Sequence, residues 1–130
     1  HVEHLKNEIG NILGLKRKWN IALVGFGNIG HALIDYAEFK KQGFYFKAIF
    51  DEDPAKVGIK VNNLQVHPFD DSCGIIAAEA IEIAIIAVPA AKAQAAIDHL
   101  VGCGVKAFLN FAPITIKVPH DVMVKNENMS

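Results

Sequence analysis

The sequence lacks a dominant charge and any long apolar run. Its 130 residues carry 13 Lys and Arg against 14 Asp and Glu, for a net charge of -1. A nucleic-acid-binding module usually carries a basic face, so this balance argues against one. A membrane span needs about 18–20 apolar residues, and the longest candidate, Ala80 to Ala91, is interrupted by Glu82 and Pro89. With 52% hydrophobic residues, the sequence predicts one folded domain with a buried core and no membrane contact.

Cysteine is also scarce. Cys73 and Cys103 are the only two, which is too few for a disulfide framework, and they form no C-x-x-C pair. Each has glycine and apolar neighbours, so we interpret both as small buried residues with reduced thiols in an intracellular protein. The alternative is a redox-active thiol, but no cluster of basic residues nearby in the sequence would lower its pKa. The six histidines show no ligand pair at helical spacing, so no metal site is predicted.

Groups that could carry catalysis are few. Ser72 and Ser130 are the only serines, and neither lies in a G-x-S-x-G motif. Lys92 follows an apolar strand end and is the nearest candidate proton donor there, but on the following helix it is expected to be solvated. We therefore predict no catalytic residues.

The sequence does contain an alternation of strand and helix patterns. Apolar runs at 21–24, 46–50, 81–88 and 105–109 predict buried strands, and 122–124 predicts a last one. Helical spacing of apolar residues appears at 2–15, 29–37, 71–79 and 90–101. Residues 57–70 predict loop and short extended pieces, with a turn at Asn62 and Asn63. This order predicts an α/β fold with a doubly wound, mostly parallel sheet and an N-terminal amphipathic helix.

A G-x-G-x-x-G motif joins the first strand to the following helix, which is the context in which this motif binds dinucleotides. Gly25 permits the tight turn, Gly27 lets the backbone approach a pyrophosphate, and Gly30 lets the helix lie close to the strand. The N–H groups at the helix start then face the phosphates. The alternative is a glycine turn without a ligand. The motif consists of Gly25, Phe26, Gly27, Asn28, Ile29 and Gly30.

Acidic residues follow the second predicted strand. Asp51 lies 21 positions after Gly30, where an acid accepts hydrogen bonds from the adenosine ribose. A carboxylate there would repel a 2′-phosphate, and Glu52 adds negative charge, so NAD(H) is favoured over NADP(H). Alternatively, Asp51 and Asp53 only build the turn before Pro54. Lys56 lies either near the adenine or in solvent.

Two further strand ends are expected to meet the nicotinamide half of the cofactor. Both are apolar apart from one asparagine. An apolar pocket disfavours the cationic oxidised ring, because burying an uncompensated charge is costly. We therefore predict a preference for NADH over NAD+. The two segments are Ala87-Val88-Pro89-Ala90 and Asn110-Phe111-Ala112-Pro113.

Together, these motifs resemble the Rex family of redox-sensing transcriptional repressors. The likeness covers nearly the whole chain. It rests on Trp19-Asn20, on the run from Leu23 to Leu33, on the run from Phe50 to Gly58, on Val88-Pro89-Ala90 and on the run from Leu109 to Pro113.

This resemblance implies the NAD(H)-sensing domain of a cytoplasmic, bacterial, homodimeric repressor. In that family a winged-helix domain, which this chain does not contain, binds operator DNA, and NADH releases it. Residues 1–18 would be the last helix of that domain and a linker, and residues 19–130 a Rossmann domain without its C-terminal helix. The glycine motif, Asp51 and both apolar segments would contact NAD(H), and Tyr36 would take part in switching. A chain that begins at His1 is accordingly expected to be a fragment.

Two other functions remain open from the residues alone. The domain could belong to an NAD-dependent dehydrogenase, or it could be a CoA-binding module of the acyl-CoA ligase type. CoA-binding modules share the strand, glycine loop and helix but do not need an acid on a ribose diol, so Asp51 favours NAD.

Overall fold

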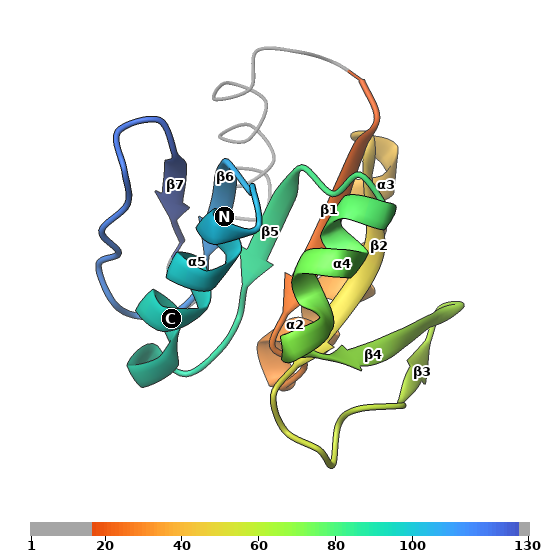
Figure 1. Ribbon diagram of the computed structural model, residues 1–130. Coiled ribbons are helices and arrows are strands. Elements are labelled where there is room, and N and C mark those ends of the chain that lie inside the picture. The colour runs from red at the N-terminus through yellow and green to blue at the C-terminus, as the bar shows by residue number, and fades with distance from the viewer. Residues whose placement is uncertain (1–16, 128–130) are drawn as a thin grey trace.

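The computed structural model describes residues 17–127, which form one seven-stranded sheet (Figure 1). The strand order is β3-β4-β2-β1-β5-β6-β7, and every neighbouring pair is parallel except β3 with β4. The predicted helix at residues 2–15 lies outside the described residues. The strands are β1 (Trp19–Val24), β2 (Phe44–Asp51), β3 (Lys60–Val61), β4 (Leu64–Pro68), β5 (Ile83–Ile86), β6 (Ala107–Asn110) and β7 (Met123–Asn126).

Helices cover both faces of this sheet. In Figure 1, α4 and α5 lie in front of the sheet, whereas α2 and α3 lie behind it. A short 3-10 helix precedes α4. The helices are α2 (Asn28–Ile34), α3 (Ala37–Lys41), η1 (Phe69–Asp71), α4 (Ser72–Ala78) and α5 (Ala90–Gly102). Within residues 17–127, none of these helices has both the length and the apolar character to cross a membrane.

The central strands supply side chains to both layers of core. In β1, Ile21 and Leu23 pack on the α2–α3 side, whereas Ala22 and Val24 pack on the α4–α5 side. All four are nearly inaccessible to solvent. This burial on both faces explains why the strand is a continuous apolar run. The predicted doubly wound, mostly parallel sheet is confirmed.

Some element boundaries differ from the predicted ones. The expected helix after the glycine motif is split in two, because α2 ends at Ile34 with Asp35 as its C-cap. The segment expected to be loop contains the β3–β4 hairpin, and β4 pairs with β2. Its turn is at the predicted place: Asn62 and Asn63 have φ of 51° and 70°, as a two-residue hairpin turn requires.

The prediction of two reduced, buried thiols is wrong, because Cys73 and Cys103 form a disulfide with their Cα atoms 4.9 Å apart. Cys73 lies on the exposed side of the first turn of α4, and Cys103 is the partly exposed C-cap of α5. The neighbouring glycines mark a helix end at Cys103 rather than tight packing. The two cysteines are 30 residues apart in the sequence, so no local pattern indicated that their sulfurs meet.

Candidate functional site

A cavity of about 880 Å³ opens at the carboxyl ends of β1, β2, β5 and β6. β1 pairs with β2 along one edge and with β5 along the other, so the strand order reverses at β1. Open α/β sheets bind ligands in the crevice at such a reversal. The volume suits a ligand of cofactor size. Most of the predicted binding residues line it: Gly25, Phe26, Gly27, Asn28, Ile29, Asp51, Glu52, Lys56, Val88, Pro89, Phe111 and Pro113.

The glycine motif forms one side of this cavity. Gly25 has φ +99°, and a Cβ there would lie 2.6 Å from the carbonyl oxygen of Ala87. A Cβ on Gly30 would lie 2.3 Å from the carbonyl oxygen of Gly25. Gly30 is therefore buried beneath the loop and does not line the cavity. Gly27 lines the cavity, and a Cβ there would meet no atom within 4 Å. The loop is thus closely packed at Gly25 and Gly30 and open at Gly27.

Asp51 ends β2 and connects the acidic turn to the glycine motif. Its Oδ2 accepts a hydrogen bond from the backbone N–H of Phe26 at 2.8 Å, and its Oδ1 accepts one from the backbone N–H of Asp53 at 2.9 Å. The turn-building role considered as an alternative is therefore present. A carboxylate has about four acceptor positions, and Asp51 is partly exposed at the cavity wall. It can accept further hydrogen bonds from a ligand.

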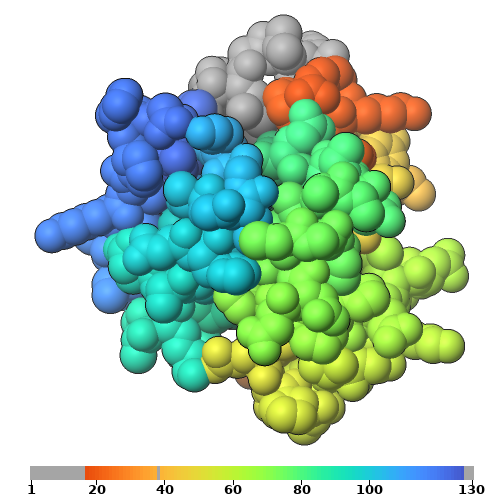
Figure 2. Space-filling view, in the orientation of Figure 1, coloured from red at the N-terminus to blue at the C-terminus, as the bar shows by residue number. Residues whose placement is uncertain are grey.

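Two lysines lie at the cavity. Lys56 is partly buried, and its Nζ donates to the carbonyl oxygen of Phe26 at 3.2 Å, so it contacts the glycine loop. Lys92, in the first turn of α5, forms an ion pair with Glu52, and both side chains are 56% exposed. In Figure 2 the yellow atoms that follow β2 accordingly lie against the cyan atoms of α5. Such an exposed pair contributes little to stability, so a ligand can replace it at small cost.

The opposite wall is apolar and consists of Ala87, Val88, Pro89, Phe111 and Pro113. Ala112 is buried behind this wall and does not line the cavity. The sequence did not indicate the contribution of Phe69, which comes from η1, or of Ala91, Ala95 and Ala96 in α5. A run of small side chains on one helix is the signal that could have suggested a ligand lying close to it.

Asn110 does not line the cavity either, although it was predicted to contact the cofactor. Its side chain is fully buried. Its Nδ2 donates to the carbonyl oxygens of Ala112 and Ile114 at 3.2 and 3.1 Å and to Oδ1 of Asn126 at 2.9 Å. Its Oδ1 accepts from the backbone N–H of Ala112 at 3.0 Å. Asn110 therefore fixes the segment that carries the apolar wall.

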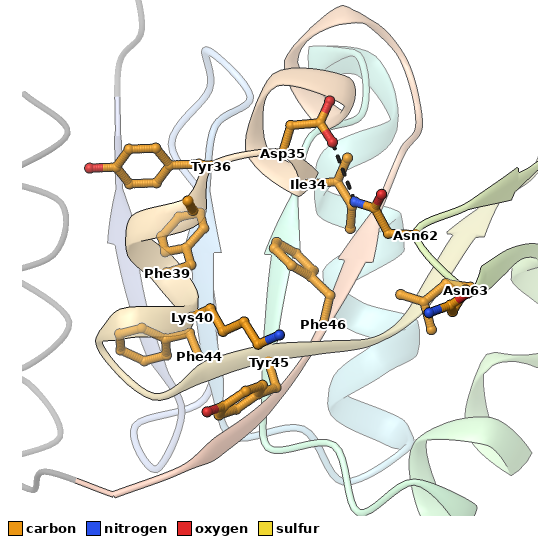
Figure 3. A pocket seen from close by; sticks show the side chains of 12 residues that line it. Ile34, Asp35, Tyr36, Phe39, Lys40, Phe44, Tyr45, Phe46, Asn62 and Asn63 are labelled. Carbon is orange, nitrogen blue, oxygen red and sulfur yellow. Dashed lines mark hydrogen bonds between the residues drawn. The ribbon is translucent and has the colours of Figure 1, made fainter.

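Tyr36 lies at a second cavity, of about 460 Å³, formed by residues from α2 to the β3–β4 turn. Figure 3 shows its ring at one edge of this cavity, pointing away from Asp35 and Asn62. The ring packs edge-on against Phe39, with ring centroids 5.1 Å apart. At the other end of the cavity, Nδ2 of Asn62 donates to Asp35 at 3.3 Å. Tyr36 is not among the residues that line the larger cavity.

Comparisons with known proteins agree with this geometry. The family model described as CoA binding domain matches residues 16–114. The redox-sensing transcriptional repressor Rex of Clostridioides difficile (strain 630) is 42% identical over all 130 residues, which cover 62% of its length. The chain thus spans less than two thirds of this curated relative.

Solved structures of RSP, a Rex-family repressor, are also similar at 40% identity. The complex of RSP with β-NADH has a TM-score of 0.86 and covers 99% of this chain and 63% of its own. The complex with β-NAD+ and operator DNA has a TM-score of 0.84 and covers 98% and 58%.

Proposed function

The chain belongs to the CoA-binding domain family, in the form carried by the redox-sensing repressors of the Rex type, and from this premise we propose that it binds NAD(H) as the sensor domain of a transcriptional repressor. In the whole protein, NADH binding would weaken the hold on operator DNA. Residues 1–18 would connect to the DNA-binding domain, and residues 19–130 would form the sensor. We further propose that the whole protein is a cytoplasmic homodimer and that Tyr36 takes part in switching.

Asp51 is the observation that carries this proposal. Its carboxylate ends β2 beside the glycine loop and keeps acceptor positions for a ribose diol after binding two backbone N–H groups. An acid in this place selects an adenosine ribose without a 2′-phosphate. CoA carries a phosphate on its ribose, so the negative charge of Asp51, Glu52 and Asp53 also disfavours CoA. The complexes of RSP with β-NADH and β-NAD+ support the same ligand class.

The apolar wall supports a preference for the reduced cofactor. The residues at the ends of β5 and β6 that line the cavity carry no charge that could compensate a pyridinium ring. Moving that cation out of water against alanine, valine, proline and phenylalanine would be unfavourable, whereas the neutral dihydronicotinamide ring loses much less hydration. We therefore propose that NADH binds more tightly than NAD+.

The same wall supports sensing rather than turnover. Among the described residues lining the cavity, the titratable side chains are Asp51, Glu52, Asp53, Lys56 and Lys92, all at the end of β2, in the loop after it or at the start of α5. The wall at the ends of β5 and β6 offers no group to transfer a proton, which a dehydrogenase needs near the hydride acceptor. A regulatory site requires none.

Calorimetric titration of the chain with NADH, NAD+, NADPH and CoA in parallel tests the proposal. We expect the tightest binding for NADH, weaker binding for NAD+, and much weaker binding for NADPH and CoA. Tighter binding of CoA than of NADH would assign the chain to CoA recognition instead. Oxidation of NADH in the presence of small aldehydes or oxo acids would contradict the sensing role.

A further inference from the structure

A second group of chemically active side chains lies outside the nucleotide cavity. Cys73 at the start of α4 meets His99 and Cys103 at the end of α5, and their ligand atoms all lie within 4.8 Å of one another. Cys73 and His99 are exposed and Cys103 is partly exposed. In Figure 2, α4 (green) and α5 (cyan) lie side by side on the face shown. The group is therefore open to solutes.

The end of α5 fixes two of these residues relative to each other. His99 and Cys103 are four residues apart, and the backbone N–H of Cys103 donates to the carbonyl oxygen of His99 at 3.1 Å. The helix then closes with hydrogen bonds from Gly104 to Val101 and from Val105 to Leu100, at 3.0 and 3.1 Å. This pair of bonds is a Schellman ending. The imidazole and the thiol are therefore held on one side of the helix end, whether or not the disulfide is present.

The His99 ring is also held from α4. Its Nε2 lies 3.1 Å from the hydroxyl of Ser72, which is completely buried. The Phe69 ring packs against the imidazole, with centroids 4.9 Å apart. A hydrogen bond that fixes the ring is the usual second contact of a histidine that binds a metal. The imidazole is thus oriented before any ion arrives.

The composition of this group selects a class of metal. Two thiolates and one imidazole suit Zn²⁺ and similar soft divalent ions. Zn–S distances of about 2.3 Å and Zn–N distances of about 2.0 Å place the ligand atoms of a tetrahedral site roughly 3.5–3.8 Å apart. In the disulfide the two sulfurs are bonded to each other, so after reduction they must move apart to this spacing, while the imidazole nitrogen already lies within 4.8 Å of both sulfurs. Three protein ligands leave a fourth position for water.

We propose that Cys73, Cys103 and His99 form a Zn²⁺-type metal site in the reduced protein, and that the disulfide is the oxidised, metal-free state of the same two sulfurs. A dithiol reductant transfers two electrons to the S–S bond, becomes a disulfide itself, and leaves two protonated thiols. The metal ion then binds both sulfurs and the imidazole and releases the two thiol protons. The two states exclude each other, because a sulfur in the disulfide has no negative charge to offer. Disulfides in cytoplasmic proteins are usually transient, so both states would be reached there.

Titration with Co²⁺ alone tests this site independently of nucleotide binding. The chain is reduced with a phosphine, freed of the reductant without air, and titrated while its absorption spectrum is recorded. We expect one Co²⁺ per chain, with thiolate-to-cobalt charge transfer in the near ultraviolet and the visible bands of a tetrahedral ion, both removed by added Zn²⁺. The oxidised chain should show neither signal. A reduced chain without the charge-transfer band overturns the proposal.

Variants assign the ligands. Cys73→Ser and Cys103→Ser should each abolish the charge-transfer band or reduce it by half with a loss of affinity, and His99→Ala should weaken Co²⁺ binding at least tenfold. Ser72→Ala should weaken it by roughly 10- to 100-fold, as expected for a positioning residue. His120→Ala, an exposed histidine in the loop before β7, is the matched control and should bind as the unmodified chain does.

The outcome does not depend on every variant folding. If a serine variant does not fold, alkylation of both thiols in the reduced chain removes the ligands without a substitution, and it should abolish Co²⁺ binding. Binding that survives alkylation, or that is equal in the His99→Ala variant and the unmodified chain, overturns the assignment. Loss of NADH binding with intact Co²⁺ binding would refute the proposed function alone.

Discussion

Gly27 offers the sharpest test of how the glycine loop meets a pyrophosphate. It precedes α2 with φ −96° and ψ −154°, an extended conformation that any residue adopts. A Cβ at this position would meet no protein atom within 4 Å, yet the residue lines the cavity. Gly27→Ala therefore adds a methyl group that the protein alone accommodates but that a closely bound phosphate would not.

The expected magnitudes follow from these contacts. Alanine is a poorer N-cap than glycine by a few tenths to about 1 kcal/mol, but it stabilises by about 0.4–1 kcal/mol through lower entropy of the unfolded chain. The free energy of unfolding should then change by less than about 1 kcal/mol. Loss of one charge-assisted N–H···phosphate hydrogen bond costs about 1.5–3 kcal/mol. That cost corresponds to a roughly 10- to 150-fold rise in the NADH dissociation constant.

Gly30→Ala is the matched comparison, because it changes the same motif in the opposite way. Its Cβ would lie 2.3 Å from the carbonyl oxygen of Gly25 and 3.3 Å from Cδ2 of Leu23. Since the nearest atom belongs to the backbone, overpacking should lower the free energy of unfolding by about 1–3 kcal/mol or more. Urea unfolding followed by circular dichroism, together with calorimetric NADH titration, separates the two variants.

A Gly27→Ala variant that unfolds at the same urea concentration as the unmodified chain and binds NADH with the same affinity would show that the pyrophosphate does not approach this loop. A Gly30→Ala variant of unchanged stability would instead show that the backbone can separate at little cost, and that the close packing of α2 on β1 is not required.

Three further predictions concern single polar side chains. Asp51→Ala should weaken NADH binding by about 1–3 kcal/mol, which calorimetry measures. It should also lower the free energy of unfolding, measured in urea, because the N–H of Phe26 loses its acceptor. Unchanged NADH affinity would contradict a hydrogen bond from Asp51 to the ribose. Asn110→Ala should destabilise the chain by roughly 2–4 kcal/mol in urea, because it leaves buried backbone groups unpaired, whereas a change below 1 kcal/mol would contradict the bonding described. The Lys106 hydrogen bond and charge lower the pKa of Asp121, so the stabilisation is present above the ordinary carboxyl pKa and disappears as the pH falls through the lowered value. Asp121→Asn should therefore be slightly less stable than the unmodified chain near neutral pH and equal to it in strong acid and in high salt; a difference that persists in acid would exclude the ion pair as its cause.

The sheet was predictable because its central strands are buried on both sides. The apolar runs at 21–24 and 46–50 have no alternation, which indicates strands covered by helices on two faces. The helix boundaries were harder to predict. The break at Asp35 between α2 and α3 is not marked by glycine or proline, because the residue ends the helix with an ordinary backbone conformation. The second short helix packs through Phe39 against Phe44 and Phe46 of β2, and the local sequence does not indicate this contact.

The lining of the larger cavity was predictable where a residue's place follows from its backbone position. Gly25 and Asp51 lie at fixed points of the strand–loop–helix unit, so their spacing was sufficient to place them at this cavity. Asn110 was different, because a polar residue at a strand end is equally suited to bind a ligand or to bind the loop that follows. Only the structure shows that the side chain makes four hydrogen bonds, three to Ala112 and Ile114 in that loop and one to Asn126 in β7.

The cysteines show where local sequence fails most clearly. The glycines and apolar residues beside Cys103 were interpreted as a sign of burial, but the glycines mark the end of α5, where a side chain is accessible. His99 lies one helical turn earlier, and Cys73 arrives from another helix because α4 and α5 lie side by side against the same face of the sheet. A metal site or a reactive disulfide depends on contact between segments that are distant in the sequence. A search for histidine pairs alone overlooks a candidate ligand set of one histidine and two cysteines. Cysteines near helix ends in a doubly wound fold should therefore be compared across neighbouring helices before they are assigned to the core.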